Sequence, residues 1–231
     1  DCTMERMKWI ADWEYVLGVN IFTPHGFHYS IEGERKRDWP PSQFYHHTWW
    51  KYYGDFNNYL KRMGYLLSGG HHVAKVGVLY PINNIWANYT PQCADAASDL
   101  CEKDYVYMTD RLLRLHYDYD YIDEDMMRKM TLKDGKFMIN GEEYSLIILP
   151  PVTQIKEHTL TLLKQFYDEG GKIIGDALLP EGILEPEGKT NIDTVIDIFG
   201  IDPLVNNRRC LLGEPVECSL IENGNANGGK A

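Results

Sequence analysis

The stretch Lys75–Pro81, KVGVLYP, carries the clearest fold signal in the chain. Its centre, Val76–Tyr80, is apolar and ends directly before a proline, which is typical of a short strand buried on both faces. Two later stretches share this pattern, Ser145–Pro150 (SLIILP) and Lys172–Gly175 (KIIG). Segments with helical periodicity separate the three. Strands that alternate with helices in this way predict an α/β fold built on a doubly wound parallel sheet.

The composition is that of an ordinary folded protein and argues against two classes of partner. The chain has 231 residues, of which 44% are hydrophobic and 25% are charged, and its formal net charge is −11. Phosphate contacts need clustered Lys and Arg, and the chain has no basic run, so we expect no nucleic-acid partner. No apolar run approaches the roughly 18–20 residues of a membrane span, so we expect no membrane partner. The chain starts without Met, which indicates that the natural N-terminus lies upstream.

The cysteines favour thiols over disulfides. The five of them, Cys2, Cys93, Cys101, Cys210 and Cys218, are an odd number and contain no C-x-x-C pair. We therefore expect free or buried thiols. A disulfide between Cys210 and Cys218 stays open as the alternative.

Three features bear on cofactors and metals. The expected loop after the first strand, Pro81–Pro91, contains no glycine, whereas a dinucleotide or phosphate site needs glycines there. The adjacent pairs His46-His47 and His71-His72 would point to opposite faces of a strand, so neither is a good chelating pair by itself. The acidic triplet Asp123–Asp125 is expected to cap a helix over Met126–Met130, with a metal site as the alternative. We accordingly predict neither cofactor nor metal in this segment.

The chain before the first strand has a different pattern. Thr3–Leu17 predicts an amphipathic helix with Thr3 as its N-cap, and Gly18 ends it. Val19–Phe22 then predicts a strand. A second helix is expected over Trp49–Leu67, closed by Gly69-Gly70. The double glycine predicts a boundary between a domain over residues 1–70 and an α/β domain over residues 71–222.

The loop Pro24–Ser30, PHGFHYS, is the chemically richest stretch of the first domain. It follows a predicted strand, and α/β folds place ligand groups at that edge of the sheet. Aromatic rings stack on the apolar faces of sugars, and imidazole and carboxylate groups bond to their hydroxyls. The alternative is a structural loop whose imidazoles bond to the backbone. The candidate sugar-contact residues are His25, Phe27, His28, Tyr29 and Glu32.

The second domain continues with further elements in chain order. Helices are expected over Gln92–His116, Thr159–Tyr167 and Asp193–Phe199, and a strand over Tyr119–Ile122. Asn140-Gly141 is a strong hairpin signal. Residues 223–231 are expected to form a disordered or truncated tail.

Five stretches together resemble a known family. They are GVNIFTPHGFHYS (18–30), RDWPPSQFYHHTWW (37–50), FNNYLKRMGYLLSGG (56–70), VAKVGVLYP (73–81) and YDYIDEDMM (119–127). They resemble the α-L-rhamnosidase-like glycoside hydrolases of family 106. The resemblance implies part of a bacterial enzyme that hydrolyses glycosidic bonds in plant or microbial polysaccharide, located in the cytoplasm or the periplasm.

The resemblance also implies a fold for each domain. Residues 1–70 resemble the last helix-strand-helix portion of a (β/α)8 barrel. Residues 71–222 resemble a flavodoxin-like, class I glutamine amidotransferase-like three-layer αβα domain. No cysteine lies on the G-x-C-x-G turn that amidotransferase chemistry needs. We therefore expect this domain to be a structural or oligomerising platform, with a second copy of the chain in a homo-oligomer as its expected partner.

Family members are thought to be inverting and calcium-assisted, with the acid and base on earlier barrel strands. We therefore assign no catalytic residue here, and any calcium belongs to the longer protein. A non-catalytic assembly or carbohydrate-binding module with a flavodoxin-like fold stays open as the alternative.

Overall fold

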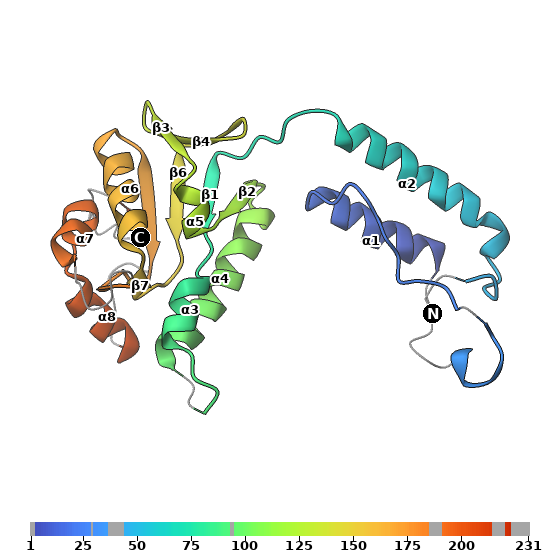
Figure 1. Ribbon diagram of the computed structural model, residues 1–231, viewed down its shortest axis with the longest axis horizontal. Helices are drawn as coiled ribbons and strands as arrows, with labels where there is room; N and C mark the ends of the chain where they lie inside the picture. Colours follow the sequence, from blue (N-terminus) through green and yellow to red (C-terminus); the bar gives the residue numbers. More distant parts are fainter. Residues whose placement is uncertain are drawn as a thin grey trace. The chain divides into compact units, whose positions relative to one another are not determined.

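The chain folds as two compact units, residues 1–71 and 72–231 (Figure 1). The structure, a computed structural model, describes residues 3–28, 30–36, 44–92, 95–184 and 191–213, and the backbone of 220–222. Tyr29, Cys2, Cys93 and Cys218 lie outside these ranges, as does the tail 223–231.

The described part of unit 1, residues 1–71, contains two α-helices. Helix α1 (Met4–Val16) begins at Thr3, whose Oγ1 accepts a hydrogen bond from the Arg6 N–H at 3.2 Å, so the predicted cap is confirmed. Helix α2 (Tyr53–Ser68) follows two 3₁₀ turns, η1 (Gly33–Lys36) and η2 (Trp50–Tyr52). The Tyr15 hydroxyl donates to the Leu60 carbonyl oxygen at 2.7 Å and ties α1 to α2.

The strand predicted over Val19–Phe22 is wrong. These residues are extended but form no ladder, and no strand occurs among the residues that the structure describes in unit 1. A strand exists only when a neighbouring strand supplies hydrogen bonds to its backbone. The described part of unit 1 offers none, and the segment instead crosses α2 at Gly64, where the Asn20 carbonyl oxygen would lie 2.7 Å from a Cβ.

Unit 2 is a mixed α/β domain with a four-strand parallel sheet. The strands run in the order β8-β6-β1-β2, and β10 joins the β8 edge in the antiparallel sense. Their bounds are β1 Val76–Leu79, β2 Tyr119–Ile122, β6 Leu146–Leu149, β8 Lys172–Asp176 and β10 Leu220–Glu222. The three apolar runs found in the sequence, together with the strand predicted over Tyr119–Ile122, are therefore the four parallel strands, as predicted. Position 77 in β1 requires glycine, because the Cβ of any other residue would lie 2.1 Å from Ile122 Cδ1.

Helices flank this sheet on both faces, with α4 and α6 on opposite sides of it (Figure 1). The helices are α3 Ile82–Asn88, α4 Ala96–Arg114, α5 Glu124–Met127, α6 Glu157–Asp168, α7 Ile192–Phe199 and α8 Pro203–Leu211. Two of them correct the sequence analysis. Part of the expected loop Pro81–Pro91 is helix α3, which is too short to show a periodic pattern. Helix α8 was not predicted from the sequence. Its N-cap is Asp202, whose Oδ1 accepts a hydrogen bond from the Leu204 N–H at 2.9 Å.

A small antiparallel sheet lies between β2 and β6 in the chain. Its strands are β3 Thr131–Lys133, β4 Lys136–Ile139 and β5 Glu142–Tyr144. Asn140 and Gly141 join β4 to β5 with φ angles of 51° and 95°, so the predicted hairpin is confirmed. A further parallel pair, β7 (Gln154–Ile155) with β9 (Gly182–Ile183), extends the loops that follow β6 and β8.

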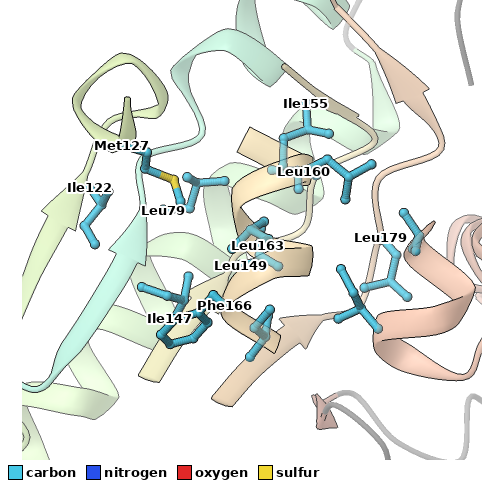
Figure 2. Packing of buried hydrophobic residues seen from close by; sticks show 14 of the residues in the cluster. Leu79, Ile122, Met127, Ile147, Leu149, Ile155, Leu160, Leu163, Phe166 and Leu179 are labelled. Carbon is cyan, nitrogen blue, oxygen red and sulfur yellow. The ribbon is translucent and has the colours of Figure 1, made fainter. Parts of the chain in front are cut away.

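The main core of unit 2 lies between the sheet and helix α6. Figure 2 shows Ile147 and Leu149 of β6 facing Leu163 and Phe166 of α6. On the other face a smaller cluster joins β1 and β6 to Met108 of α4. The central strands β1 and β6 therefore bury side chains on both faces, which explains their continuous apolar sequences.

Candidate functional site

A cavity of about 610 Å³ lies within unit 1. Its walls come from the extended segment after α1, from the loop that follows, and from one face of α2. The lining residues are Tyr15, Asn20, Ile21, Phe22, Pro24, His25, Gly26, Phe27, Tyr53, Asn57, Leu60, Lys61, Gly64, Tyr65 and Ser68. Aromatic rings and uncharged polar groups dominate, and Lys61 is the charged side chain in this lining.

Two of the candidates found in the sequence line this cavity. His25 and Phe27 both lie on its wall and both are exposed, Phe27 at 53%. The Phe27 ring is held by Phe44 and Trp50, whose ring centroids lie 5.6 Å and 5.7 Å away. An aromatic ring that is supported on its edges yet open to solvent can stack on the apolar face of a ligand.

The other candidates lie elsewhere or are not described. The His28 ring packs edge-on against Phe44, with centroids 5.2 Å apart, and does not line the cavity. Glu32 is exposed and also absent from the lining, and its backbone N–H donates to Ser30 Oγ at 3.2 Å. Tyr29 lies outside the described residues. The proposed roles of these residues stay predictions.

Helix α2 supplies the polar side of the cavity, which the sequence analysis missed. Tyr53, Asn57, Lys61 and Tyr65 recur every four residues and line the cavity along one helix face. Spacing of four places side chains above one another on a helix, so this stripe was open to detection from the sequence. The Tyr53 hydroxyl is partly buried, which raises its pKa above the ordinary value.

Gly64 sets the width of this cavity, and we expect Gly64→Ala to disturb it. A Cβ there would lie 2.7 Å from the backbone oxygen of Asn20, so the segment that carries the cavity wall must move. We expect a loss of about 1–3 kcal/mol from the unfolding free energy of unit 1, the usual cost of overpacking. Urea unfolding followed by tryptophan fluorescence measures it.

Gly54→Ala is the matched control for this prediction. Gly54 lies in the same helix and has nothing within 4 Å of its Cβ position. Gly54 lies in the first turn of α2 and a Cβ there meets no other atom, so this variant should be about as stable as the parent chain. Equal losses in the two variants would contradict the close contact between Gly64 and Asn20.

The carboxyl edge of the sheet in unit 2, where α/β folds usually bind ligands, is filled by structural hydrogen bonds. Asn84 Oδ1 accepts from the backbone N–H groups of Thr153 and Gln154 at 2.9 and 3.0 Å. Glu124 Oε2 accepts from the Lys156 N–H at 2.8 Å, and both Asn84 and Glu124 are buried. These side chains hold neighbouring loops together.

The acidic triplet of unit 2 has a structural role. Asp123 is the N-cap of α5, and its Oδ1 accepts from the Asp125 N–H at 2.8 Å, so the capping role is confirmed for Asp123. The helix itself is Glu124–Met127 and not Met126–Met130 as predicted, so Glu124 and Asp125 lie within its first turn. Asp125 pairs with the Lys156 ammonium at 3.0 Å. That hydrogen bond lowers the pKa of Asp125 below its ordinary value.

The described cysteines have no nucleophilic character. Cys101 is fully buried in the core, and burial raises the pKa of its thiol to about 12. Cys210 is also a free thiol, and its Sγ–H donates to the Ala177 carbonyl oxygen at 3.3 Å. A reactive cysteine needs a lowered pKa and an electropositive setting. The described thiols are therefore structural.

None of the helices that the structure describes combines the length and the apolar character needed to cross a membrane.

Several known proteins are similar to this chain. A protein of Formosa agariphila named "Putative beta-glucuronidase" is 27% identical over 129 residues, which are 55% of this chain and 10% of that protein. The rhamnosidase structure from Novosphingobium sp. PP1Y is 16% identical with a TM-score of 0.53, over 86% of this chain and 19% of that one. The family 42 beta-galactosidase Gan42B of G. stearothermophilus is 19% identical with a TM-score of 0.45, over 65% and 20%.

This chain thus spans about a tenth of the curated relative and about a fifth of the two solved structures. At 16% identity, the rhamnosidase structure is evidence for the fold alone. The sequence profile of one family, alpha-L-rhamnosidase, matches residues 2–200. Because that match covers most of the chain, including the cavity residues and the parallel sheet, the chain belongs to the alpha-L-rhamnosidase family, family 106 of the glycoside hydrolases.

Proposed function

We propose that this chain is a segment of a longer glycoside hydrolase that cleaves α-L-rhamnosides, and that the cavity of unit 1 contacts the sugar. The observation that carries the proposal is the placement of His25 and Phe27 on one wall and of Asn57 and Lys61 on the other. An aromatic face with convergent hydrogen-bonding groups is the arrangement that pyranose sugars need.

Each wall has its own task in this proposal. The exposed ring of Phe27 stacks on the apolar face of the sugar, where its edge is already supported by Trp50. His25 and Asn57 bond to hydroxyl groups as donors or acceptors, and Lys61 donates. In this way the cavity binds and orients a glycoside without taking part in proton transfer.

The acid and base come from outside this segment. Glycoside hydrolysis requires two carboxyl groups on opposite sides of the scissile bond. The described lining of the cavity contains neither Asp nor Glu. Consequently the longer protein supplies both groups, and we assign no catalytic residue to this chain.

Unit 1 also presents an apolar surface suited to further contacts in the longer protein. Helix α1 buries Met7, Ala11 and Tyr15 against its neighbours, whereas its other face exposes Trp9 at 68% and Trp13 at 55%. Large exposed apolar surfaces mark interaction sites in soluble proteins. This pattern supports the interpretation of unit 1 as the end of a (β/α)8 barrel.

Unit 2 serves as a non-catalytic platform with a flavodoxin-like arrangement. The support is chemical: structural hydrogen bonds occupy the carboxyl edge of its sheet through Asn84 and Glu124, and the thiol of Cys101 is buried. Its contribution is to hold the longer protein together, within one subunit or between subunits of a homo-oligomer.

The test is hydrolysis of an aryl α-L-rhamnoside by this chain and by the protein extended upstream. Release of aryl alcohol by the extended protein alone is the expected result, because only that protein holds both carboxyl groups. Activity of the 231-residue chain by itself would overturn the assignment of the acid and base, and inactivity of both would contradict the rhamnoside as substrate.

We expect His25→Ala to lower kcat/KM of the extended protein by about 10- to 100-fold. Loss of a hydrogen bond to substrate costs about 1.5–3 kcal/mol when one partner is charged or fully desolvated, and each 1.4 kcal/mol is a factor of ten. Steady-state kinetics on the aryl rhamnoside measure it. His71→Ala, at an exposed histidine outside the cavity, is the matched control and should keep the parental rate. An unchanged kcat/KM in His25→Ala would remove the cavity from the proposal.

A further inference from the structure

A histidine and three carboxylates meet at the start of the sheet in unit 2. His72 lies on the extended segment that leads into β1, Asp118 and Asp120 lie at the start of β2, and Glu142 lies at the start of β5. The ring nitrogens of His72 lie 2.9 Å from Asp118 Oδ2, 3.5 Å from Asp120 Oδ2 and 3.9 Å from Glu142 Oε2. Three separate elements thus bring their polar groups to one point.

The two ring nitrogens of His72 have different surroundings. Nε2 forms a hydrogen bond with Asp118 Oδ2 at 2.9 Å. Nδ1 makes no hydrogen bond among the described residues and faces Asp120 and Glu142 instead. In metal sites a histidine typically binds the ion through one nitrogen while a carboxylate holds the other. The arrangement of His72 between Asp118 and the two remaining carboxylates is of this kind.

We propose that His72 Nδ1, Asp120 and Glu142 bind a divalent transition-metal cation, with Zn²⁺ the best match. One ligand atom from each residue lies within 4.8 Å of the other two. Zinc binds imidazole nitrogen and carboxylate oxygen at about 2.0–2.2 Å, so two tetrahedral ligand atoms lie about 3.4 Å apart. The Nδ1 to Asp120 distance of 3.5 Å meets this spacing, and the Nδ1 to Glu142 distance is 3.9 Å. Asp120 and Glu142 lie within 4.8 Å of each other, so the Glu142 side chain must move toward the other two ligands when the metal binds.

Hydrogen bonds around the three ligands keep them in position. The Tyr144 hydroxyl is on a nearly buried side chain and donates to Asp120 Oδ2 at 2.9 Å. Asp118 orients the His72 ring from the opposite side. Such outer partners fix ligand geometry, and the Asp118 carboxylate also raises the basicity of the His72 imidazole. The site therefore has three protein ligands, and a fourth position remains for water.

The local charge also favours a cation. The carboxylates of Asp118, Asp120 and Glu142 all lie within 3.9 Å of the His72 ring nitrogens, and their negative charge attracts a cation. Imidazole nitrogen suits Zn²⁺ and similar ions, whereas Ca²⁺ and Mg²⁺ prefer oxygen ligands alone. The choice of His72 as a ligand therefore selects a transition metal.

A bound metal would join the segment before β1 to the edge strand β2 and to the small sheet. Its role is structural, because it fixes the point where the chain enters unit 2. The sequence gives no sign of it, since His72 is separated from Asp120 and Glu142 by 48 and 70 positions of the chain. The proposal stands apart from the rhamnosidase activity, and its test reads metal binding alone.

The test is calorimetric titration of the metal-free 231-residue chain with ZnCl₂ near neutral pH. We expect binding at one site, weakened at least about tenfold in His72→Gln, Asp120→Asn and Glu142→Gln. Asp118→Asn should weaken binding by about tenfold through the orientation of the ring. His71→Gln is the matched control, because it removes the neighbouring exposed histidine and should leave the affinity unchanged.

Titration with CoCl₂ and CaCl₂ supplies a second readout. Cobalt bound to the imidazole should give a visible absorption band that His72→Gln abolishes, and Ca²⁺ should bind more weakly than Zn²⁺. Far-ultraviolet circular dichroism identifies any variant that fails to fold, in which case Glu142→Gln, in a half-buried surface strand, decides. Equal zinc affinity in His72→Gln and the parent chain, absence of zinc binding, or a preference for Ca²⁺ would each overturn the proposal.

Discussion

Phe166→Ala is expected to lower the free energy of unfolding of unit 2 by about 3–5 kcal/mol, the usual cost of removing a buried aromatic ring. Phe166 is fully buried between α6 and the sheet (Figure 2). Its ring stacks on Phe137 with centroids 4.6 Å apart and an angle of 7° between the rings. A Cβ at Gly171 would lie 2.5 Å from three atoms of the ring, so little space remains for repacking.

Differential scanning calorimetry of the chain measures this loss as a lower transition temperature for unit 2. Phe166→Leu is the matched control, because it keeps most of the buried volume and should cost clearly less. The exposed Tyr65→Ala, at a side chain 86% accessible in unit 1, should leave the transition of unit 2 in place. A loss below about 1 kcal/mol in Phe166→Ala would contradict the packing shown for this core.

Asp176 is expected to make unit 2 less stable as the pH rises from about 4 to 6. Its carboxyl group is 9% exposed and borders an apolar groove of about 550 Å³ next to α4. Burial, and to a lesser extent the charge of Asp104, raise the pKa of Asp176 to about 6. The charge of Asp176 in turn helps to raise the pKa of the Cys210 thiol, although burial is the larger cause.

The sign of the effect follows from proton binding. The folded-state pKa lies above the ordinary value of 3.8, so the folded protein retains the proton of Asp176 after the unfolded chain has lost it. The contribution of Asp176 to stability is therefore largest below about pH 4, is lost between about pH 4 and 6, and is absent above that range. A shift of two pH units corresponds to about 3 kcal/mol.

Asp176→Asn isolates this contribution. The variant should match the parent chain at pH 4 and exceed its unfolding free energy by about 3 kcal/mol at pH 8. Urea unfolding of both proteins at intervals between pH 4 and 8 measures the difference. Asp104→Asn should reduce the pH dependence only in part, because burial is the larger cause. A difference between Asp176→Asn and the parent chain that did not change with pH would contradict the raised pKa.

Two residues of the candidate site were predicted from the sequence, but the arrangement of the cavity walls was not. His25 and Phe27 were predicted from the loop PHGFHYS and line the cavity, whereas His28 from the same loop packs on Phe44. Neighbouring side chains of one loop point in different directions. The direction of each side chain depends on contacts that the loop makes with distant parts of the chain, which the local sequence does not show. The opposite wall comes from the four-residue spacing of Tyr53, Asn57, Lys61 and Tyr65 on α2, which the sequence contains but which the sequence analysis did not identify.

The parallel sheet of unit 2 was predictable from the sequence alone. Its strands Val76–Leu79, Leu146–Leu149 and Lys172–Asp176 carry apolar residues on both faces, and only a sheet covered by helices on both sides buries such strands. The ends of α1 were likewise predictable, from Thr3 as N-cap and from Gly18. The turn between β4 and β5 was predictable from Asn140-Gly141. The tertiary structure alone decided two other matters. Val19–Phe22 forms no strand, since pairing requires a partner strand that the described part of unit 1 does not provide. The meeting of His72 with Asp120 and Glu142 depends on strand register across three elements, and no local pattern encodes a contact between residues so far apart in the chain.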